Sequence, residues 1–257
     1  MTFVELLASA TRARGSLVAE IPEVWHQGRT AYGGLTTALA FEAARSVADD
    51  LPPLRSAQIA FIGPVQGKVD ARATLLRRGR STAFVESKVL VDGAVAFSAM
   101  FVFASDRESA TMLDADRAPD VPVPEAAPER GAKLMAPAFL SQFDFRFATP
   151  PQRGVPNILQ WARLRDRDGL DPMTELLMIA DALPPGAMPL MQSFAPVSSV
   201  TWHVNILSGS AKTRDGWWLL QATAQNAGNG LSSQSMDIWN ADGEAIAKGM
   251  QCMALFG

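Results

Sequence analysis

Residues 175–183 read Glu175-Leu176-Leu177-Met178-Ile179-Ala180-Asp181-Ala182-Leu183, and Pro184-Pro185-Gly186 ends this run. In front of it, Asp171-Pro172 predicts a helix start, with a carboxylate at the N-cap and a proline at the first helical position, which needs no N–H. Placed on a helix, the run is apolar on nearly every side, so other elements must enclose it. The rest of the chain is therefore organised around this buried helix.

Asp181 is the one charged residue inside the apolar part of the run. The pattern places it in the last turn of the helix, where desolvation and the negative end of the helix dipole both oppose its ionisation. A carboxylate in such a place needs hydrogen-bonding partners or a chemical task. Two interpretations stay open, a catalytic Asp181 and a structural Asp181 that holds the backbone before the two prolines.

A second enclosed helix is predicted over residues 35–45, which are mostly apolar and rich in small side chains. Gly33-Gly34 begins it, directly after Tyr32. Glycines at a helix start let a ligand approach the free N–H groups of the first turn, which favour an anion or a developing oxyanion. A tight turn with close packing is the alternative.

The remaining patterns are those of strands, and they occur twice. Strands are predicted over residues 17–21, 57–62, 69–76, 82–91 and 95–103, and again over 139–148, 157–165, 200–207, 217–226, 231–240 and 244–255. The Asp92-Gly93 and Asp242-Gly243 hairpin turns lie 150 residues apart, each between two strands. Each half also has one enclosed helix before its long run of strands. The chain is thus interpreted as a duplication of a unit of about 110 to 120 residues, with an α+β layout of helices packed on curled antiparallel sheet.

Residues 105–137 interrupt these patterns with five prolines, many charges and many alanines. Such a composition predicts an extended linker with little structure of its own. The predicted organisation is an N-terminal unit over 1–104, a Pro-rich linker over 105–137 and a C-terminal unit over 138–257.

Composition narrows the function classes. The net charge is −3 with both signs mixed along the chain, which argues against a nucleic-acid surface. The single cysteine, Cys252, cannot form an internal disulfide, so we expect a reducing cytoplasm. The N-terminus has no signal-peptide pattern, and no run approaches the roughly 20 apolar residues that span a bilayer, so no membrane contact is expected. No G-x-S-x-G elbow, zinc-type Cys/His cluster or complete dinucleotide fingerprint occurs, and neither a metal nor a cofactor is predicted.

Several short motifs follow one another in a particular order. They are Tyr32-Gly33-Gly34, Phe61-Ile62-Gly63-Pro64, the Asp92-Gly93 hairpin, Trp161-Ala162-Arg163-Leu164, Ile179-Ala180-Asp181-Ala182, Val200-Thr201-Trp202-His203-Val204 and Asp242-Gly243-Glu244 running to Lys248-Gly249-Met250-Gln251. Their order and spacing resemble the acyl-CoA thioesterase II-like family over nearly the whole chain. The resemblance implies a double hotdog fold, with two tandem repeats in which a curled antiparallel sheet wraps a long helix.

The resemblance also implies an active site in which an Asp, a Thr or Ser, and a Gln hold and polarise a water molecule. Asp181 matches the Asp and Gln251 matches the Gln. The repeat supports Gln251 independently, because the residue 150 positions earlier is Phe101. An amide in one copy and an apolar residue in the other suit a site that exists in one half only. A Gln251 that caps an edge of the sheet is the alternative.

The family's hydroxyl residue falls at Val197, which has no hydroxyl, and Ser198 and Ser199 follow it. Neighbouring side chains of a strand point to opposite faces, so Ser199 shares a face with Val197 and Ser198 does not. Directly after Pro196 the chain is still entering the strand, and a one-residue irregularity there would move Ser198 into place. Ser198 is preferred because it needs the smaller displacement, and Ser199 is the other candidate.

These residue types suit hydrolysis of a thioester. A thioester is already a good electrophile, so the attacking water needs orientation and partial deprotonation, and a carboxylate accepts its proton. An amide and a hydroxyl hold the water by hydrogen bonds. The N–H of Gly33 or Gly34, beside Tyr32, is the candidate donor to the thioester oxygen as that oxygen gains charge.

The exposed tip Arg77-Arg78-Gly79-Arg80 is a candidate contact for the phosphates of coenzyme A, although a basic hairpin tip is more often only solvated. The predicted function is hydrolysis of an acyl-CoA to the free acid and CoA, in lipid metabolism, by a homodimer. Two alternatives stay open. One is a hotdog hydratase or dehydratase, which needs a histidine such as His203 beside an acid, and the other is a non-catalytic acyl-CoA binding protein.

Overall fold

The computed structural model of the protein describes residues 1–131, 137–193 and 195–256. Its α-helices are α1 (Phe3–Ser9), α2 (Gly33–Arg45) and α3 (Pro172–Ala180), and its short 3-10 helices are η1 (Glu23–Trp25), η2 (Ala138–Gln142), η3 (Met188–Leu190) and η4 (Arg214–Gly216). The strands of the first half are β1 (Thr11–Ala13), β2 (Ser16–Ile21), β3 (His26–Gln27), β4 (Thr30–Ala31), β5 (Leu54–Phe61), β6 (Gly67–Arg78), β7 (Thr82–Val91) and β8 (Ala94–Ala104). Those of the second half are β9 (Phe143–Thr149), β10 (Asn157–Leu164), β11 (Val197–Ile206), β12 (Trp218–Gly228), β13 (Leu231–Asn240) and β14 (Ala245–Leu255).

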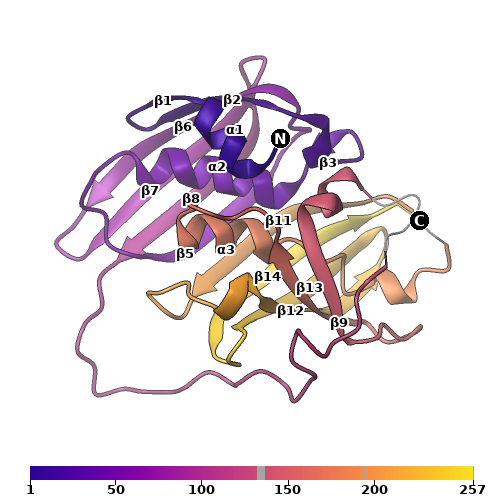
Figure 1. Ribbon diagram of the computed structural model, residues 1–257. Helices are drawn as coiled ribbons and strands as arrows, with labels where there is room; N and C mark the ends of the chain where they lie inside the picture. Colours follow the sequence, from indigo (N-terminus) through magenta and orange to yellow (C-terminus); the bar gives the residue numbers. More distant parts are fainter. Residues whose placement is uncertain (132–136, 194, 257) are drawn as a thin grey trace.

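Twelve strands form one sheet in the order β1-β2-β6-β7-β8-β5-β11-β14-β13-β12-β10-β9, and β3 and β4 form a separate hairpin. Every pairing in the large sheet is antiparallel. The two halves of the chain join edge to edge where β5 pairs with β11, with Ile59 opposite Trp202. Figure 1 shows α2 and α3 on the same side of this sheet. The α+β class predicted from the sequence is therefore confirmed.

Helices α2 and α3 are the enclosed elements of the core. Every residue of α2 from Gly34 to Ala44 is buried, and so is α3 from Leu176 to Ala180. The start of α2 packs on the end of α3 so closely that a Cβ on Gly34 would lie 2.2 Å from the Met178 carbonyl oxygen. Only glycine fits this contact, because no real side chain tolerates that distance. The apolar helix that the sequence predicts is thus buried against the second predicted helix.

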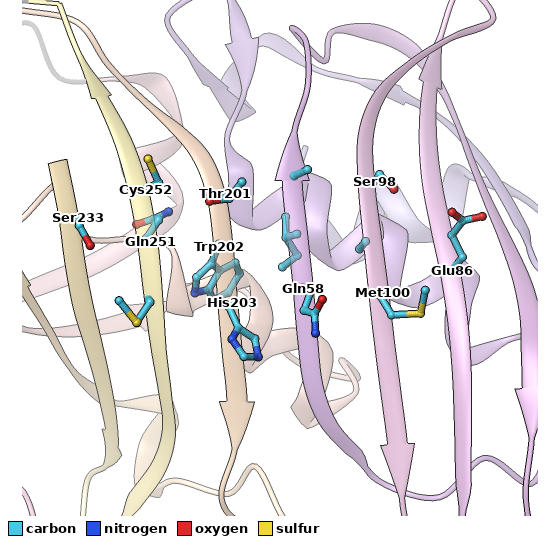
Figure 2. A pocket seen from close by; sticks show the side chains of 14 residues that line it. Gln58, Glu86, Ser98, Met100, Thr201, Trp202, His203, Ser233, Gln251 and Cys252 are labelled. Carbon is cyan, nitrogen blue, oxygen red and sulfur yellow. The ribbon is translucent and has the colours of Figure 1, made fainter. Parts of the chain in front are cut away.

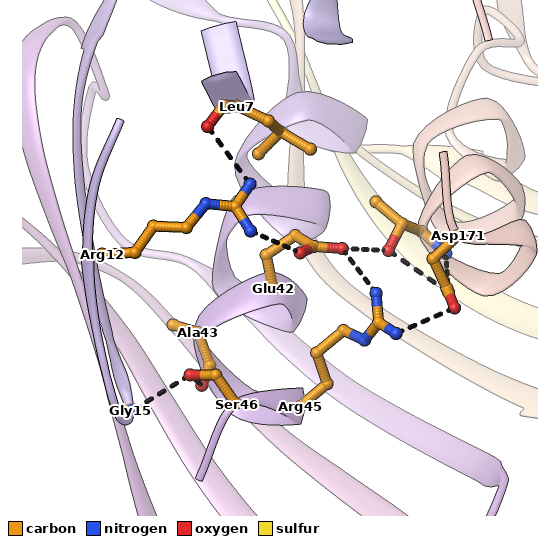
Figure 3. Close-up of polar contacts among 9 residues, drawn as sticks. Leu7, Arg12, Gly15, Glu42, Ala43, Arg45, Ser46 and Asp171 are labelled. Carbon is orange, nitrogen blue, oxygen red and sulfur yellow. Dashed lines mark hydrogen bonds and ion pairs between the residues drawn. The ribbon is translucent and has the colours of Figure 1, made fainter. Parts of the chain in front are cut away.

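The polar side chains at the other end of this helix pair form a second link between the halves (Figure 3). The carboxylate of Glu42 on α2 accepts hydrogen bonds from Arg12 at 3.4 Å, Arg45 at 3.2 Å and the Thr174 hydroxyl at 2.5 Å. Arg45 also contacts Asp171, the N-cap residue of α3, at 3.1 Å. Glu42 is buried, and its charge is matched by two arginines, which satisfies the requirement that a buried charge be paired.

The segment that precedes Phe143 differs from its prediction as part of a strand over 139–148. It forms η2 instead, and the Phe139 ring stacks on Tyr32 with ring centroids 4.2 Å apart. The chain turns inward there because the aromatic side chain fills the core beside α2. Strand β9 therefore begins at Phe143.

The predicted linker contains no helix or strand over its described residues 105–131 and 137. It is nevertheless attached to the second half of the sheet. The indole N–H of Trp239 donates to the Asp116 carbonyl and that of Trp161 donates to the Pro122 carbonyl, each at 2.9 Å. Both tryptophans belong to a small apolar cluster that also contains Ala127 from the segment. The segment thus lies along the C-terminal half of the sheet.

Candidate active site

Asp181 is the C-cap residue of α3, directly after Ala180, with φ −93° and ψ 9°. The sequence predicts Asp181 inside the last turn of the helix, whereas the helix in the structure ends one residue before Asp181. The helix stops here because Pro184 and Pro185 cannot continue it. The side chain of Asp181 is buried, at 9% exposure for the residue, and faces the start of α2. A Cβ on Gly33 would lie 2.5 Å from its Oδ2 atom, so glycine is required at this point as well.

Gln251 comes to Asp181 from β14. Its Nε2 atom donates to Asp181 Oδ1 at 2.8 Å and to Ser199 Oγ on β11 at 2.8 Å. Gln251 is buried, so these bonds are formed without competition from water. The structure thus brings together three residue types that the sequence predicts for one site, a carboxylate, an amide and a hydroxyl.

The preference for Ser198 over Ser199 is wrong. Ser198 is exposed and its hydroxyl contacts the Ser199 carbonyl, whereas the Ser199 hydroxyl faces the site. The physical reason is the position of a β-bulge. The register of β11 against β14 shifts between Ser199 and Thr201, so the irregularity lies after Ser199 rather than before Ser198. Val197 and Ser199 keep the alternation that places both on the partly buried side of the strand.

Burial raises the pKa of Asp181 to about 7, although hydrogen bonds from Gln251 and from the Gly34 N–H act in the opposite direction. The desolvation of the carboxylate is therefore larger than the stabilisation of its charged form. A carboxyl group with a pKa near neutral pH is suited to accept and return a proton. The negative end of α3, which points at Asp181, acts in the same direction as burial.

The glycines at the start of α2 have different surroundings. The Gly34 N–H is engaged with the Asp181 carboxylate. The Gly33 N–H stands at the first position of α2, where no intrahelical acceptor exists. Gly33 is therefore the better placed of the two for the predicted oxyanion contact.

Tyr32 does not fit the prediction that it contacts substrate. Its hydroxyl donates to the Met178 carbonyl at 2.6 Å, and the side chain is fully buried. Burial first, and then the charge of Asp181, raise the pKa of Tyr32 well above its ordinary value of 10.0, so the phenol stays protonated. Tyr32 instead joins the start of α2 to the last turn of α3.

Gln234 is a residue of the site that sequence reasoning missed. It lies on β13 directly opposite Gln251, and its Nε2 donates to Gln251 Oε1 at 2.7 Å. Its Oε1 accepts the Gly186 N–H at 2.8 Å. A signal was present in the sequence, since Gln234 alternates in phase with the apolar Met236 and Ile238 and so falls on the buried face of its strand.

The arginine tip is not brought to the site. Phe61 on β5 lies next to Gly33. Through the pairing of β5 with β8, β8 with β7 and β7 with β6, Phe61 is in register with Ala71 on β6. Arg78 stands seven residues further along β6, which corresponds to about 20 Å. There it donates to Asp50, at 2.9 Å to the carboxylate. Arg77, Arg78 and Arg80 are all exposed, as the solvated alternative expects.

His203 lies on the outer face of the sheet, opposite to the face that holds Asp181. Its buried neighbours on β11, Trp202 and Val204, point to the core, whereas His203 is exposed. Figure 2 shows it beside Gln58 of β5, in a pocket of about 750 Å³, and its Nε2 lies 3.2 Å from the Ser56 hydroxyl. His203 is thus a surface residue that cannot pair with Asp181.

The family described as Acyl-CoA thioesterase C-terminal domain matches residues 115–255, and the Acyl-CoA thioesterase N-terminal domain matches residues 21–104. No curated protein matches the chain. In the part of the chain that the structure describes, no helix is both long and apolar enough to cross a membrane.

Solved structures resemble the whole fold. A protein of unknown function with a hot dog fold from Alicyclobacillus acidocaldarius is 22% identical with a TM-score of 0.85, covering 100% of this chain and 99% of its own. A putative thioesterase II from Thermobifida fusca is 20% identical with a TM-score of 0.84, covering 100% and 98%. An acyl-CoA thioesterase II from Mycobacterium marinum is 19% identical with a TM-score of 0.77, covering 98% and 97%. At these identities the likeness shows the hotdog fold.

Proposed function

Because the chain belongs to the acyl-CoA thioesterase family and is a thioester hydrolase, we propose that it hydrolyses an acyl-CoA through a water molecule held by Asp181, Gln251 and Ser199. The observation that supports this mechanism is the buried connection from Asp181 Oδ1 through Gln251 Nε2 to Ser199 Oγ, with 2.8 Å at each step. The connection lies beside the first turn of α2, where a developing negative charge is stabilised.

Each group has a defined task in this mechanism. Ser199 Oγ accepts from Gln251, so its own O–H is left to donate to the water. The water then donates one proton to the Asp181 carboxylate while its oxygen attacks the thioester carbon. The carbonyl oxygen gains charge near the Gly33 N–H. When the C–S bond breaks, Asp181 returns the proton to the sulfur, which leaves the free acid and the CoA thiol.

Asp181 is therefore the general base in its charged form. Since its pKa is about 7, we expect kcat/KM to rise about tenfold per pH unit below that value and to level off above it. His203 does not support the hydratase alternative, which needs a histidine beside the acid, because it lies on the opposite face of the sheet.

The experiment is release of free thiol from short, medium, long and aryl acyl-CoAs, without added metal or cofactor. We expect turnover on at least one of them, and loss of that turnover in Asp181→Asn. An absence of turnover above background on every acyl-CoA would contradict the proposal and favour the binding-protein alternative.

The finer architecture is part of the same proposal. Residues 1–104 and 138–257 would each be one hotdog unit, with 105–137 as the linker between them. Support comes from the repeated order of one buried helix followed by long antiparallel strands, and from the junction of the halves through β5 and β11. A role in lipid metabolism follows from acyl-CoA hydrolysis, and the cytoplasmic location rests on the single Cys252 and stays a prediction.

A further inference from the structure

The hydrogen bonds around Gln251 begin at a group that can only donate. The Gly186 N–H donates to Gln234 Oε1 at 2.8 Å, which determines which end of the Gln234 amide faces that loop. The Gln234 NH2 group therefore faces the other way and donates to Gln251 Oε1 at 2.7 Å. A backbone N–H thus sets the direction of every bond that follows it.

The same reasoning determines the orientation of Gln251. With its oxygen accepting from Gln234, both of its N–H bonds are left for Asp181 Oδ1 and Ser199 Oγ, each at 2.8 Å. A reversed Gln251 amide would place its oxygen against the Asp181 carboxylate and its NH2 against the NH2 of Gln234. Both contacts would be repulsive, and water cannot relieve them because Gln234 and Gln251 are 1% and 4% exposed.

We infer that Gln234 is a positioning residue for the hydrolysis, which locks the Gln251 amide with its NH2 group toward Asp181 and Ser199. The inference rests on the proposed function, since it acts through the residues that hold the water. Gln234 itself contacts neither the water nor the substrate in this scheme.

The first half of the chain has no counterpart of this amide pair. There Val85 and Phe101 are opposite each other on β7 and β8, in the place that Gln234 and Gln251 occupy on β13 and β14. Both are fully buried. An apolar pair therefore satisfies the packing requirement of this position, and the two amides are present only beside Asp181.

The test uses the substitution Gln234→Met, which keeps the approximate volume and removes the donor to Gln251. The Gln251 amide is then free to reverse. We expect kcat to fall about tenfold with KM little changed, because an interaction of the transition state is weakened. We also expect the acidic limb of the pH profile to move upward by about one unit, because the Asp181 carboxylate loses a hydrogen-bond donor.

The matched control is Gln160→Met on β10. Gln160 is also a buried glutamine, at 2% exposure, and it accepts from Arg130 at 3.4 Å, away from Asp181. We expect this variant to keep the kcat and the pH profile of the natural chain. A second arm places Gln234→Met in a Gln251→Met background, where it should lower kcat no further, because Gln234 acts only through Gln251.

A readout without turnover separates the inference from the proposed function. The pH dependence of unfolding, compared with that of Asp181→Asn, reports the pKa of Asp181 directly. Tyr32 is a titratable neighbour of Asp181, and burial first, then the charge of Asp181, raise its pKa. It stays protonated between about pH 5 and pH 9, so it does not contribute to the pH dependence of unfolding in this range. In Gln234→Met this pKa should rise even if no acyl-CoA is hydrolysed.

If Gln234→Met fails to fold, NMR of the natural chain tests the orientation of the Gln251 amide through its side-chain NH2 signals. We expect its NH2 resonances, assigned by their loss in Gln251→Met, to shift as Asp181 titrates, because they bond to that carboxylate. An unmoved Asp181 pKa, an effect on kcat that multiplies with that of Gln251→Met, or NH2 resonances insensitive to the Asp181 titration would each overturn the inference. An inactive natural chain with the expected Asp181 pKa shift would instead overturn the proposed function alone.

Discussion

Asp181 links stability to pH as well as to catalysis. Its pKa is raised from 3.8 to about 7, so between these values the folded protein binds a proton that the unfolded chain has lost. The free energy of unfolding therefore falls as pH rises through this window and changes no further through Asp181 above about 7. At pH values where the base is active, the fold tolerates an unfavourable buried charge.

Asp181→Asn tests this directly. The variant has no titratable group at this position, so it should lose the pH dependence and, near pH 8, gain about 1 to 3 kcal/mol of stability. Turnover should fall at least a hundredfold, since the general base is gone. The free energy of unfolding in urea at pH 5 and 8 and the rate of thiol release, measured on one sample, distinguish a catalytic Asp181 from a structural one. A lower free energy of unfolding near pH 8 with an unchanged rate per folded molecule would identify Asp181 as a structural helix stop.

The two neighbouring serines provide a matched pair of variants. Ser199→Ala removes the hydroxyl that accepts from Gln251, and kcat/KM should fall about tenfold to a hundredfold, the equivalent of one hydrogen bond of about 1 to 3 kcal/mol. Ser198→Ala removes an exposed hydroxyl and should leave the rate nearly unchanged. Equal, near-natural rates for both would show that no hydroxyl takes part.

At the scale of elements, α2 and α3 are joined at both ends by different chemistry. Near Asp181 the helices pack closely, with Gly34 against the Met178 carbonyl, which also accepts a hydrogen bond from the Tyr32 hydroxyl. At the opposite end it is polar, through Glu42 and Thr174. The close-packed end brings the site residues together, and the polar end at Glu42 determines how the N-terminal half meets the start of α3.

Thr174→Val should therefore reduce stability without affecting turnover. The substitution removes a donor to the buried Glu42 carboxylate and should cost about 1 to 3 kcal/mol. Thr174→Ser keeps the hydroxyl and serves as the control, with most of the stability retained. Chemical unfolding and kcat on the same preparations provide the comparison. A fall in kcat per folded molecule would mean that the polar end also controls the site.

At the scale of the whole molecule, the sheet still has two outer edges. Joining β5 to β11 covers one edge of each half. Strands β1 and β9 stand at the ends of the twelve strands, and the backbone of β9 also pairs with residues 128–130 of the linker. Strand β1 is exposed along its three residues. Unpaired edges offer backbone groups to another chain.

We therefore expect a homodimer. Light scattering at several concentrations should give about twice the 27.5 kDa chain mass. A monomer at all practical concentrations would contradict this expectation.

The sequence by itself determined the elements and predicts a duplication. Apolar runs, a proline after an N-cap Asp and two Asp-Gly turns are local signals, and they predicted both buried helices and the long strands to within a few residues. Asp181 was found directly as the one charge in an apolar run, whereas Gln251 came from the resemblance and was supported by Phe101 at the corresponding place in the other half. Resemblance to the thioesterase II-like family then suggested their chemistry.

Tertiary structure alone decided which side chains meet. Ser199 rather than Ser198 reaches Gln251 because a bulge after Ser199 maintains its alternation, and the position of a bulge depends on the partner strand. Alternation along β13 places Gln234 on the buried face, but only the pairing of β13 with β14 puts it opposite Gln251. The sequence predicts that burial opposes ionisation of Asp181, but the pKa of about 7 depends on the packing of α2 against the end of α3. Such effects depend on contacts between distant segments, and those contacts exist only once the chain has folded.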